Sequence, residues 1–556
     1  MNRRRILLIS SLCLLLGSTT SLAGPRTERE MLAIAQTHLA KGAVTRSALS
    51  VTKLAEERFY SVYGNDSQGY VIVSRDDSFT PIIGYSDTRF DANSLPCGMQ
   101  WWLEAISEQM ASKASETSFA SVSAKRAATF TPKPFFCRTE WDQGDPYNFY
   151  APEFKGNHAP TGCVATAMSQ IMKYFTYPTQ GKGKGYYTIE GNSSRVTENI
   201  TGVYEWDKMQ DTYNVFDLTD EIRIPVARLM KDAGLATHMQ YGSNGSGAYS
   251  VEAARGFAYN FGYDSLAMHC YYRQYFDEEV WMQCIYDELG NDRPILYTGS
   301  AGANSGHAFV FDGIDEEGRI HVNWGWGGSG NGYYDFADLN PLDEQGKPTS
   351  SHYNSEQSML FGFKCQEEPD EGEKYHSLWC GSKPYKLSVE GKIIQVESNA
   401  IYNYHFLWFY GDIGLNFENT DGDAERNTFI SLSKQDGVAT FFGSGNLTTS
   451  KFFTKVKAGH YRVYLASKAV NEDSCQPVRC DGGAIYYELT IADDGSTSLS
   501  GSKVMKDNPL TSVKTITSDV RTSNHYIYDL QGRQYSSSDI LNKGIYIIEG
   551  KKVVKR

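Results

Sequence analysis

The amino-acid sequence predicts an α+β protein that is divided into several domains. Its 556 residues exceed what a single hydrophobic core usually organises. Hydrophobic residues make up 40% of the chain and charged residues 21%, so packed cores can form and wholesale disorder is excluded. Helical and strand-like patterns are mixed up to about residue 365 and short alternating segments follow, which predicts mixed domains first and β-rich domains afterwards.

The charge balance restricts the possible partners. The chain carries 53 Lys and Arg against 66 Asp and Glu, a formal net charge of −13. A nucleic-acid-binding protein needs a basic surface to meet phosphate, so we expect no nucleic-acid partner. Mean hydropathy is −0.44 and no apolar run is long enough to span a bilayer, so we expect no permanent membrane anchor.

Residues 1–23 are expected to be a secretory signal peptide. Arg3, Arg4 and Arg5 precede an apolar stretch, and small residues up to Ala23 offer a cleavage site. The apolar stretch is too short for a transmembrane helix. The sequence therefore predicts an exported protein.

Nine cysteines remain once Cys13 leaves with the signal peptide. An odd number in an exported protein predicts that one thiol stays free, whereas the pairing of the others cannot be read from the sequence. No CxxC pair occurs and the histidines lack metal-ligand spacing, so we expect neither a metal nor another cofactor. The nine are Cys97, Cys137, Cys163, Cys270, Cys284, Cys365, Cys380, Cys475 and Cys480.

Residues 24–126 are predicted to form a small α+β unit. Periodicity predicts two helices and a strand, at Glu28–Ala40, Met99–Met110 and Gly69–Val73. The end of this unit is rich in Ser and Ala and contains Lys125 and Arg126. Such a segment is either a flexible linker or a proteolytic processing site, and both interpretations stay open.

The chain after residue 365 is predicted to hold two β-rich domains. Segments such as Lys386–Val389 and His460–Leu465 alternate between turns rich in Gly, Asp and Asn, which predicts a β-sandwich-like accessory domain over 366–510. Residues 511–556 predict a separate small β domain of two hairpins. The net charge of this last stretch is +4, the reverse of the whole chain.

Cys163 lies at the start of a predicted amphipathic helix. Thr161 is the expected N-cap, and Pro178 bars continuation of the helix. A cysteine in the first turn has unpaired backbone N–H groups and the helix dipole to stabilise a thiolate. Taken alone, Cys163 fits a buried structural thiol better than a nucleophile, because free cysteine is among the most buried residue types. The apolar face is Val164, Met168, Ile171, Met172 and Phe175.

A histidine and an amide that suit a cysteine nucleophile occur downstream. His307 begins an apolar strand, and Asn323 lies on the next, alternating strand. If the connection between the strands is the five residues 314–318, Asn323 shares a face with His307, whereas a connection of even length would put them on opposite faces. His307 would then accept the thiol proton while Asn323 orients its ring. His321 is the rival base, and we interpret it as a strand-surface residue.

Charge on a tetrahedral intermediate requires a donor besides the backbone N–H of Cys163. The turn Trp141–Asn148 contains Gln143, whose neutral amide can donate to an oxyanion. A single Gln in a loop is usually solvated, so this assignment depends on the rest of the site.

These motifs together resemble the streptopain-like cysteine peptidases of the papain clan. By this resemblance, residues 127–365 form a papain-like two-lobed catalytic domain with Cys163 as nucleophile and His307 as base. Gln143 matches the oxyanion glutamine, and Asn323 and Trp324 match residues that support the histidine. The matching runs are Trp141–Asn148, Thr161–Ala167, Gln170–Tyr174, Gly306–Val310 and His321–Gly328.

The same resemblance implies a zymogen and its substrates. Residues 24–126 would be an inhibitory prosegment that blocks the cleft until it is cleaved near Lys125 and Arg126. Proteins and peptides would be the substrates, with an apolar residue preferred two places before the cut. Loops bordering the cleft would bind them, and the residues expected to do so are Gly306, Gly325 and Trp326.

Residues 511–556 resemble the type A sorting domain of the type IX secretion system. The resemblance rests on Tyr528–Arg533, Lys543–Tyr546 and Gly550–Val554. It implies passage across an outer membrane by that secretion machinery, after Sec export, and removal of the tail. Neither resemblance covers 366–510.

Two other functions remain open at this point. The same Cys-His chemistry serves amide hydrolysis or acyl transfer on non-protein substrates. Alternatively, the chain is a surface adhesin that binds through 366–510 and has a vestigial peptidase site.

Overall fold

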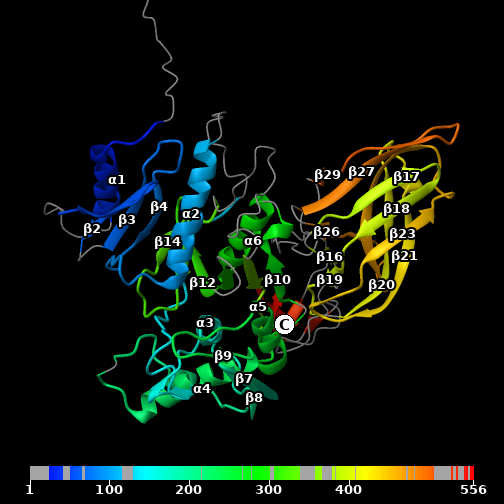
Figure 1. Ribbon diagram of the computed structural model, residues 1–556. Coiled ribbons are helices and arrows are strands. Elements are labelled where there is room, and N and C mark those ends of the chain that lie inside the picture. Colours follow the sequence, from blue (N-terminus) through cyan, green and yellow to red (C-terminus); the bar gives the residue numbers. More distant parts are fainter. Residues whose placement is uncertain are drawn as a thin grey trace, which may run out of the picture. The chain divides into compact units, whose positions relative to one another are not determined.

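The computed structural model describes most of residues 24–505 and the strands of the C-terminal unit (Figure 1). The described ranges are 24–41, 50–65, 69–115, 129–214, 216–265, 267–276, 278–300, 306–337, 357–365, 378–381, 383–406, 408–470, 472, 474–480, 483–505, 527–529, 534–535, 544–548 and 551–555. The expected signal peptide and the Lys125–Arg126 processing site lie outside them. The chain divides into two compact units, Met1–Pro509 and Leu510–Arg556.

Residues 24–115, which we call the N-terminal region, contain both predicted helices, α1 (Glu28–Lys41) and α2 (Cys97–Ser115), and the predicted strand β3. Helix α1 begins with a capping box, because Thr27 and Glu30 exchange side-chain to backbone hydrogen bonds. Its buried residues recur every four positions, at Met31, Ala35 and Leu39. This stripe packs α1 on the strands of the N-terminal region.

Strands of the N-terminal region continue into the sheet of residues 129–365, which we call the central region. The shared sheet has ten strands, and β4 and β14 pair antiparallel at the junction (Figure 1). In spatial order the strands are β1 (Thr52–Glu56), β2 (Tyr60–Asn65), β3 (Gly69–Ser74), β4 (Ile82–Ser86), β14 (Gly332–Tyr334), β13 (Ile320–Asn323), β12 (His307–Ile314), β11 (Ile295–Gly299), β15 (Ser358–Phe361) and β10 (His269–Tyr272).

Helix α3 (Cys163–Phe175) is the centre of the core of the central region. Val164, Met168, Ile171 and Met172 are at most 4% exposed, which confirms the predicted apolar face, and they pack with Ala308 and Val310 of β12. The helix ends before Pro178, with Thr176 as a left-handed C-cap. The other helices are α4 (Asp220–Ala236), α5 (Ser250–Arg255), α6 (Glu278–Gly290), η1 (Trp206–Lys208), η2 (Gly256–Asn260) and η3 (Arg273–Tyr275).

Two small sheets complete the central region. One has the order β8 (Asn192–Asn199), β7 (Lys184–Ile189), β9 (Gln240–Tyr241), and the other pairs β5 (Glu153–Phe154) with β6 (Asn157–His158).

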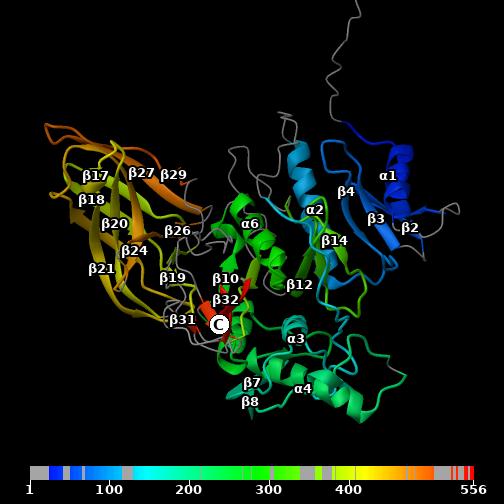
Figure 2. The ribbon, with the colours of Figure 1, turned by 180° about the vertical axis from the view of Figure 1, so that it is seen from behind.

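Residues 378–505, which we call the accessory region, consist almost entirely of strands. A three-stranded sheet and an eleven-stranded sheet bury their apolar faces in one core (Figure 2). The small sheet is β17 (Lys386–Glu390), β18 (Ile393–Ser398) and β23 (Leu447–Phe452). The large sheet is β21 (Thr428–Val438), β20 (Phe409–Asn419), β24 (Gly459–Ala469), β27 (Gly483–Ile491), β26 (Arg479–Cys480), β16 (Trp379–Cys380), β19 (Ile401–Asn403) and β22 (Phe442–Gly443), with β25 (Gln476–Pro477), β28 (Thr497–Leu499) and β29 (Lys503–Val504) on its side branches.

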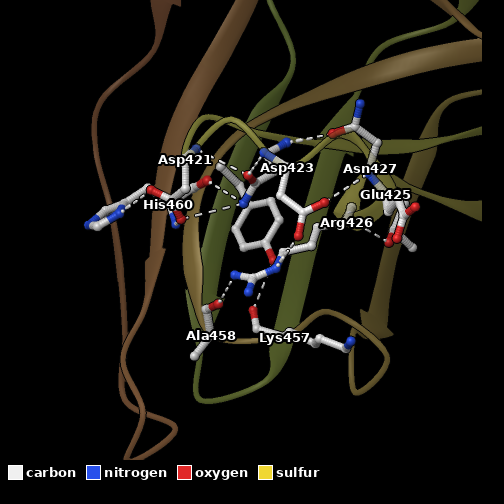
Figure 3. A network of polar contacts seen from close by, with 11 residues as sticks. Asp421, Asp423, Glu425, Arg426, Asn427, Lys457, Ala458 and His460 are labelled. Carbon is white, nitrogen blue, oxygen red and sulfur yellow. Dashed lines mark hydrogen bonds and ion pairs between the residues drawn. The ribbon is translucent and has the colours of Figure 1, made fainter.

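A polar network closes the turn between β20 and β21, around the short helix η4 (Ala424–Arg426) (Figure 3). The Asn419 side chain accepts from the backbone N–H groups of Asp421 and Asp423. Asp421 binds the ring and backbone of His460, and Asp423 forms a 3.0 Å ion pair with Arg426. These carboxylates are thus occupied by groups of the turn and of β24, and the described residues hold no group of three or more His, Cys, Asp or Glu side chains that could bind a metal ion.

The C-terminal unit forms a four-stranded sheet in the order β31 (Gln534–Tyr535), β30 (Ile527–Asp529), β32 (Gly544–Ile548), β33 (Lys551–Lys555). Strands β30 and β31 pair antiparallel, as do β32 and β33, which agrees with the two expected hairpins. Across the described parts of both units, none of the helices has the length and apolar character needed to span a membrane.

Candidate active site

Cys163 is the first residue of helix α3, as expected, but the N-cap differs from the prediction. Gly162 caps the helix with a φ of 89°, and the Thr161 hydroxyl instead contacts Thr166 at 2.9 Å. A Cβ on Gly162 would also lie 2.7 Å from the Met239 sulfur. Only glycine suits both this backbone conformation and this close approach, so Gly162 fixes where the helix begins and where Cys163 points.

Backbone N–H groups surround the Cys163 sulfur. The N–H of Ala308 donates to Sγ at 3.4 Å, which joins the start of β12 to the start of α3. Burial raises the pKa of the Cys163 thiol, and the N–H groups of Ala308, Val164 and Cys163 itself oppose the rise. The backbone N–H groups therefore offer a thiolate partial stabilisation.

His307 is the first residue of β12 and pairs across the sheet with Gly299. Burial lowers the pKa of its imidazole. The described residues include both His307 and Cys163, and no hydrogen bond between their side chains is among the contacts found. In the full-length chain, burial thus favours the neutral forms of both groups.

The register of β12 and β13 contradicts the expectation that Asn323 shares a face with His307. Asn323 pairs with Val310, three residues beyond His307, so the two side chains project to opposite faces. The physical reason is a β-bulge between Phe311 and Gly313, which shifts the register by one residue. Asn323 instead donates to the carbonyl of Thr139 at 2.6 Å.

His321 was expected on the strand surface, and this expectation is wrong. The residue is 6% exposed, and its Nδ1 lies 2.5 Å from the buried carboxylate of Asp312. Its ring stacks on Phe135, and the second oxygen of Asp312 accepts from the N–H of Cys137. His321 thus belongs to a buried cluster that holds the start of the central region against β12.

Gln143 is half-buried in a loop that is tied to the nucleophile helix. Its carbonyl accepts from the N–H of Thr161 at 3.0 Å, two residues before Cys163. The N–H of Gln143 donates to its neighbour Asp142 at 2.6 Å. These bonds fix the backbone from which the Gln143 amide extends.

Trp324 forms part of a buried aromatic group beside the site. Its indole N–H donates to the carbonyl of Gly330, and its ring lies 4.8 Å from that of Phe309. Gly325 follows with a φ of 68° and packs on α3, where a Cβ would lie 3.2 Å from Thr166. Gly306 is exposed immediately before His307, and Trp326 is half-buried.

The start of α2 in the N-terminal region covers Trp324 and Phe309. A Cβ on Gly98 would lie 2.7 Å from the Trp324 ring and 3.1 Å from the Phe309 ring. The thiol of Cys97 adds a small electrostatic rise to the pKa of Cys163. The N-terminal region therefore reaches the surroundings of the cysteine.

Gln170 is a site residue that the sequence analysis did not assign. It is fully buried on α3, and its Oε1 accepts from the Thr139 hydroxyl at 3.0 Å and from the N–H of Trp141 at 3.4 Å. Because Asn323 donates to the Thr139 carbonyl, one network joins α3, β13 and the segment leading to Gln143. A polar residue on an otherwise apolar helix face was the available signal.

Comparisons with known proteins show which family the chain belongs to. The profile of the Peptidase C10 family matches residues 141–334, and the profile described as Spi protease inhibitor matches residues 26–110. Streptopain of Streptococcus pyogenes is 33% identical over 324 residues, covering 54% of this chain and 80% of streptopain. The thiol protease/hemagglutinin PrtT of Porphyromonas gingivalis is 30% identical over 368 residues, covering 62% of this chain and 42% of PrtT.

A solved structure of a Prevotella intermedia prointerpain A fragment is also similar. It is 30% identical, with a TM-score of 0.49, and the match covers 57% of this chain and 98% of the fragment. The alignment with streptopain, at 33% identity over four fifths of that protein, decides the family. The chain is a cysteine peptidase with a Spi inhibitor-like prodomain, and it belongs to the Peptidase C10 family.

Proposed function

We propose that the protein is the secreted zymogen of a cysteine endopeptidase with Cys163 as nucleophile and His307 as base. The observation that carries this proposal is the hydrogen bond from the Ala308 N–H to the Cys163 sulfur. It brings the helix start, where a thiolate is stabilised, next to the strand residue that precedes Ala308 in the sequence.

The proposed reaction is acyl transfer through a thioester. His307 takes the Cys163 proton, and the thiolate attacks the peptide carbonyl carbon. The oxyanion accepts hydrogen bonds from the Cys163 N–H and the Gln143 amide. His307 then protonates the leaving amine, and water hydrolyses the acyl-enzyme. Trp324 supports the histidine once the prosegment has left, and Asn323 acts only indirectly, by tying β13 to the Thr139 carbonyl.

Substrates are proteins and peptides in extended conformation. Gly306, Gly325 and Trp326 border the cleft and bind the substrate backbone, and an apolar side chain is preferred two residues before the cut. The exposure of Gly306 next to His307 supports this placement.

The prosegment, residues 24–126, acts as an intramolecular inhibitor in this proposal. Three contacts support it: the β4–β14 pairing, the hydroxyl contact of Tyr70 with Tyr334 at 2.6 Å, and the donation of the Trp102 indole to the Asp335 carbonyl at 3.0 Å. Cleavage near Lys125 and Arg126 releases the prosegment.

The Sec signal and the C-terminal sorting domain direct the chain through the type IX machinery to the cell surface or medium.

Casein hydrolysis by single cysteine variants tests the proposal. Cys163→Ala should lose activity by a factor of about 10³ or more, because no other group can form the acyl-enzyme. Cys475→Ala, a matched change in the accessory region, should keep wild-type activity. Comparable hydrolysis by Cys163→Ala would refute the assignment. N-terminal sequencing of both secreted forms would locate the mature start and show whether processing needs Cys163.

A further inference from the structure

Two buried cysteines face each other in the accessory region. Strands β16 and β26 run parallel, and Trp379 pairs with Arg479. The following residues of the two strands, Cys380 and Cys480, therefore stand side by side on the same face of the sheet. They are a hundred positions apart in the sequence.

Both thiols lie in the apolar core of this region. Cys380 and Cys480 are each 0% exposed. A hydrogen bond joins the two thiols and lowers the pKa of Cys380, and the Cys380 sulfur also lies 3.5 Å from the Ser398 hydroxyl. The two sulfur atoms are thus within hydrogen-bonding reach of each other.

The strand geometry suits a covalent link. Adjacent strands lie about 4.7–4.9 Å apart, inside the range of about 4.4–6.8 Å that Cα atoms of disulfide-bonded cysteines span. We propose that Cys380 and Cys480 form a structural disulfide when the chain folds in an oxidising environment. The bond would be made during folding, before the core closes over the sulfurs.

A low-molecular-weight disulfide such as oxidised glutathione supplies the oxidising equivalents. One cysteine thiolate attacks it, which forms a mixed disulfide and releases one glutathione thiolate. The second cysteine thiolate then displaces the other glutathione. The two cysteines lose two electrons and two protons, and the small disulfide is reduced to two thiols.

The same two strands contact the central region. The Tyr275 hydroxyl donates to the Cys380 carbonyl at 2.8 Å, and Arg479 donates to the Tyr275 carbonyl at 3.3 Å. The Arg479 guanidinium lies 4.7 Å above the Phe276 ring, and the Trp379 ring lies 5.3 Å from it. A bond between β16 and β26 would hold Trp379 and Arg479 as one unit against η3.

Peptide mapping of the full-length Cys163→Ala chain, which removes the reactive thiol of the proposed peptidase site, tests the disulfide directly. The protein is refolded in a buffer of reduced and oxidised glutathione, denatured without reductant, and alkylated with N-ethylmaleimide. We expect a linked peptide containing Cys380 and Cys480, 2 Da lighter than its two thiol parts, that disappears after reduction. N-ethylmaleimide on both residues, or a link of either one to another cysteine, would overturn the proposal.

Thermal unfolding gives a second readout. A reductant should lower the unfolding midpoint of the oxidised chain by about 5 °C or more, because the link closes a long loop. Cys475→Ser, a control in the same region, should keep this shift, whereas the pair Cys380→Ala and Cys480→Ala should lose it. If the reductant lowered the unfolding midpoint equally in the parent and in the double variant, the disulfide assignment would be contradicted. This holds even if the double variant is less stable overall.

Discussion

The side chain of Gln143 has one expected task, which is donation to the oxyanion. Its backbone is fixed by the Thr161 N–H, two residues before the nucleophile. We predict that Gln143→Ala lowers kcat by about 10²–10³ with little change in KM, because the donor matters only in the transition state. Steady-state kinetics on a fluorogenic peptide measure both constants. The control Gln180→Ala, a change at an exposed glutamine, should leave both constants unchanged. A Gln143→Ala variant with a raised KM and an unchanged kcat would contradict the oxyanion role.

At the scale of single residues, the sequence predicted candidate site residues by type but not all of their surroundings. Cys163 at a helix start could be predicted because apolar periodicity and Pro178 bound the helix. The burial of His321 could not, because its partner Asp312 lies on the neighbouring strand and only the folded hairpin brings them together. Gly162 as N-cap was missed because the close approach of Met239 is a tertiary contact.

The hairpin of β12 and β13 determines what Asn323 does in the full-length chain. Asn323 is 1% exposed, donates to the Thr139 carbonyl, and accepts from the Gly325 N–H at 3.1 Å. We predict that Asn323→Ala lowers the free energy of unfolding by about 1–3 kcal/mol, because both partners are left unpaired. Urea unfolding in the Cys163→Ala background measures this change. The exposed control Asn192→Ala should unfold like the parent, and an Asn323→Ala variant that did the same would contradict the network.

At the scale of elements, the few helices and strands that periodicity predicted are present in the structure. Helices α1, α2 and α3 and strands β3, β17 and β24 lie where alternation or helical spacing placed them. The predicted face of Asn323 was wrong, because a β-bulge inserts one residue into the strand without interrupting the apolar sequence pattern. The joining of β4 to β14 also could not be predicted, since pairing of strands so distant in sequence leaves no local signal.

At the scale of the whole molecule, the N-terminal and central regions share one ten-stranded sheet through the pairing of β4 with β14. Gly84 pairs with Tyr334 there, and a Cβ on Gly84 would lie 2.7 Å from the Tyr334 ring. We predict that Gly84→Val weakens docking of the N-terminal region on the central region by about 1–3 kcal/mol. Because a loosely docked prosegment is cleaved more readily, conversion of the full-length chain to the processed enzyme should become roughly tenfold faster. Gel densitometry over time measures the conversion rate.

The control for this change is Ala92→Val, which adds the same side chain at an exposed turn position of the N-terminal region. It should be converted at the wild-type rate. If Gly84→Val folds normally and is also converted at that rate, the β4–β14 junction does not restrain activation.

Burial explains the protonation state of the site in the full-length chain. Burial raises the pKa of Cys163 and lowers that of His307, so both groups are neutral near pH 7 in the full-length chain. Its Cys163 should therefore react with iodoacetamide only as pH rises beyond the ordinary thiol range of about 8.5. Release of the N-terminal region should reverse both shifts by allowing a thiolate–imidazolium pair to form.

The central claim is tested most directly by the pH dependence of Cys163 alkylation in the processed enzyme, followed by peptide mass spectrometry. We predict rapid labelling of wild-type enzyme from about pH 5 upward, because His307 stabilises the thiolate as an ion pair. In His307→Ala the rapid phase below about pH 8 should vanish, leaving the profile of an isolated thiol. Superimposable profiles for the two enzymes would contradict the claim that these residues act as a catalytic pair.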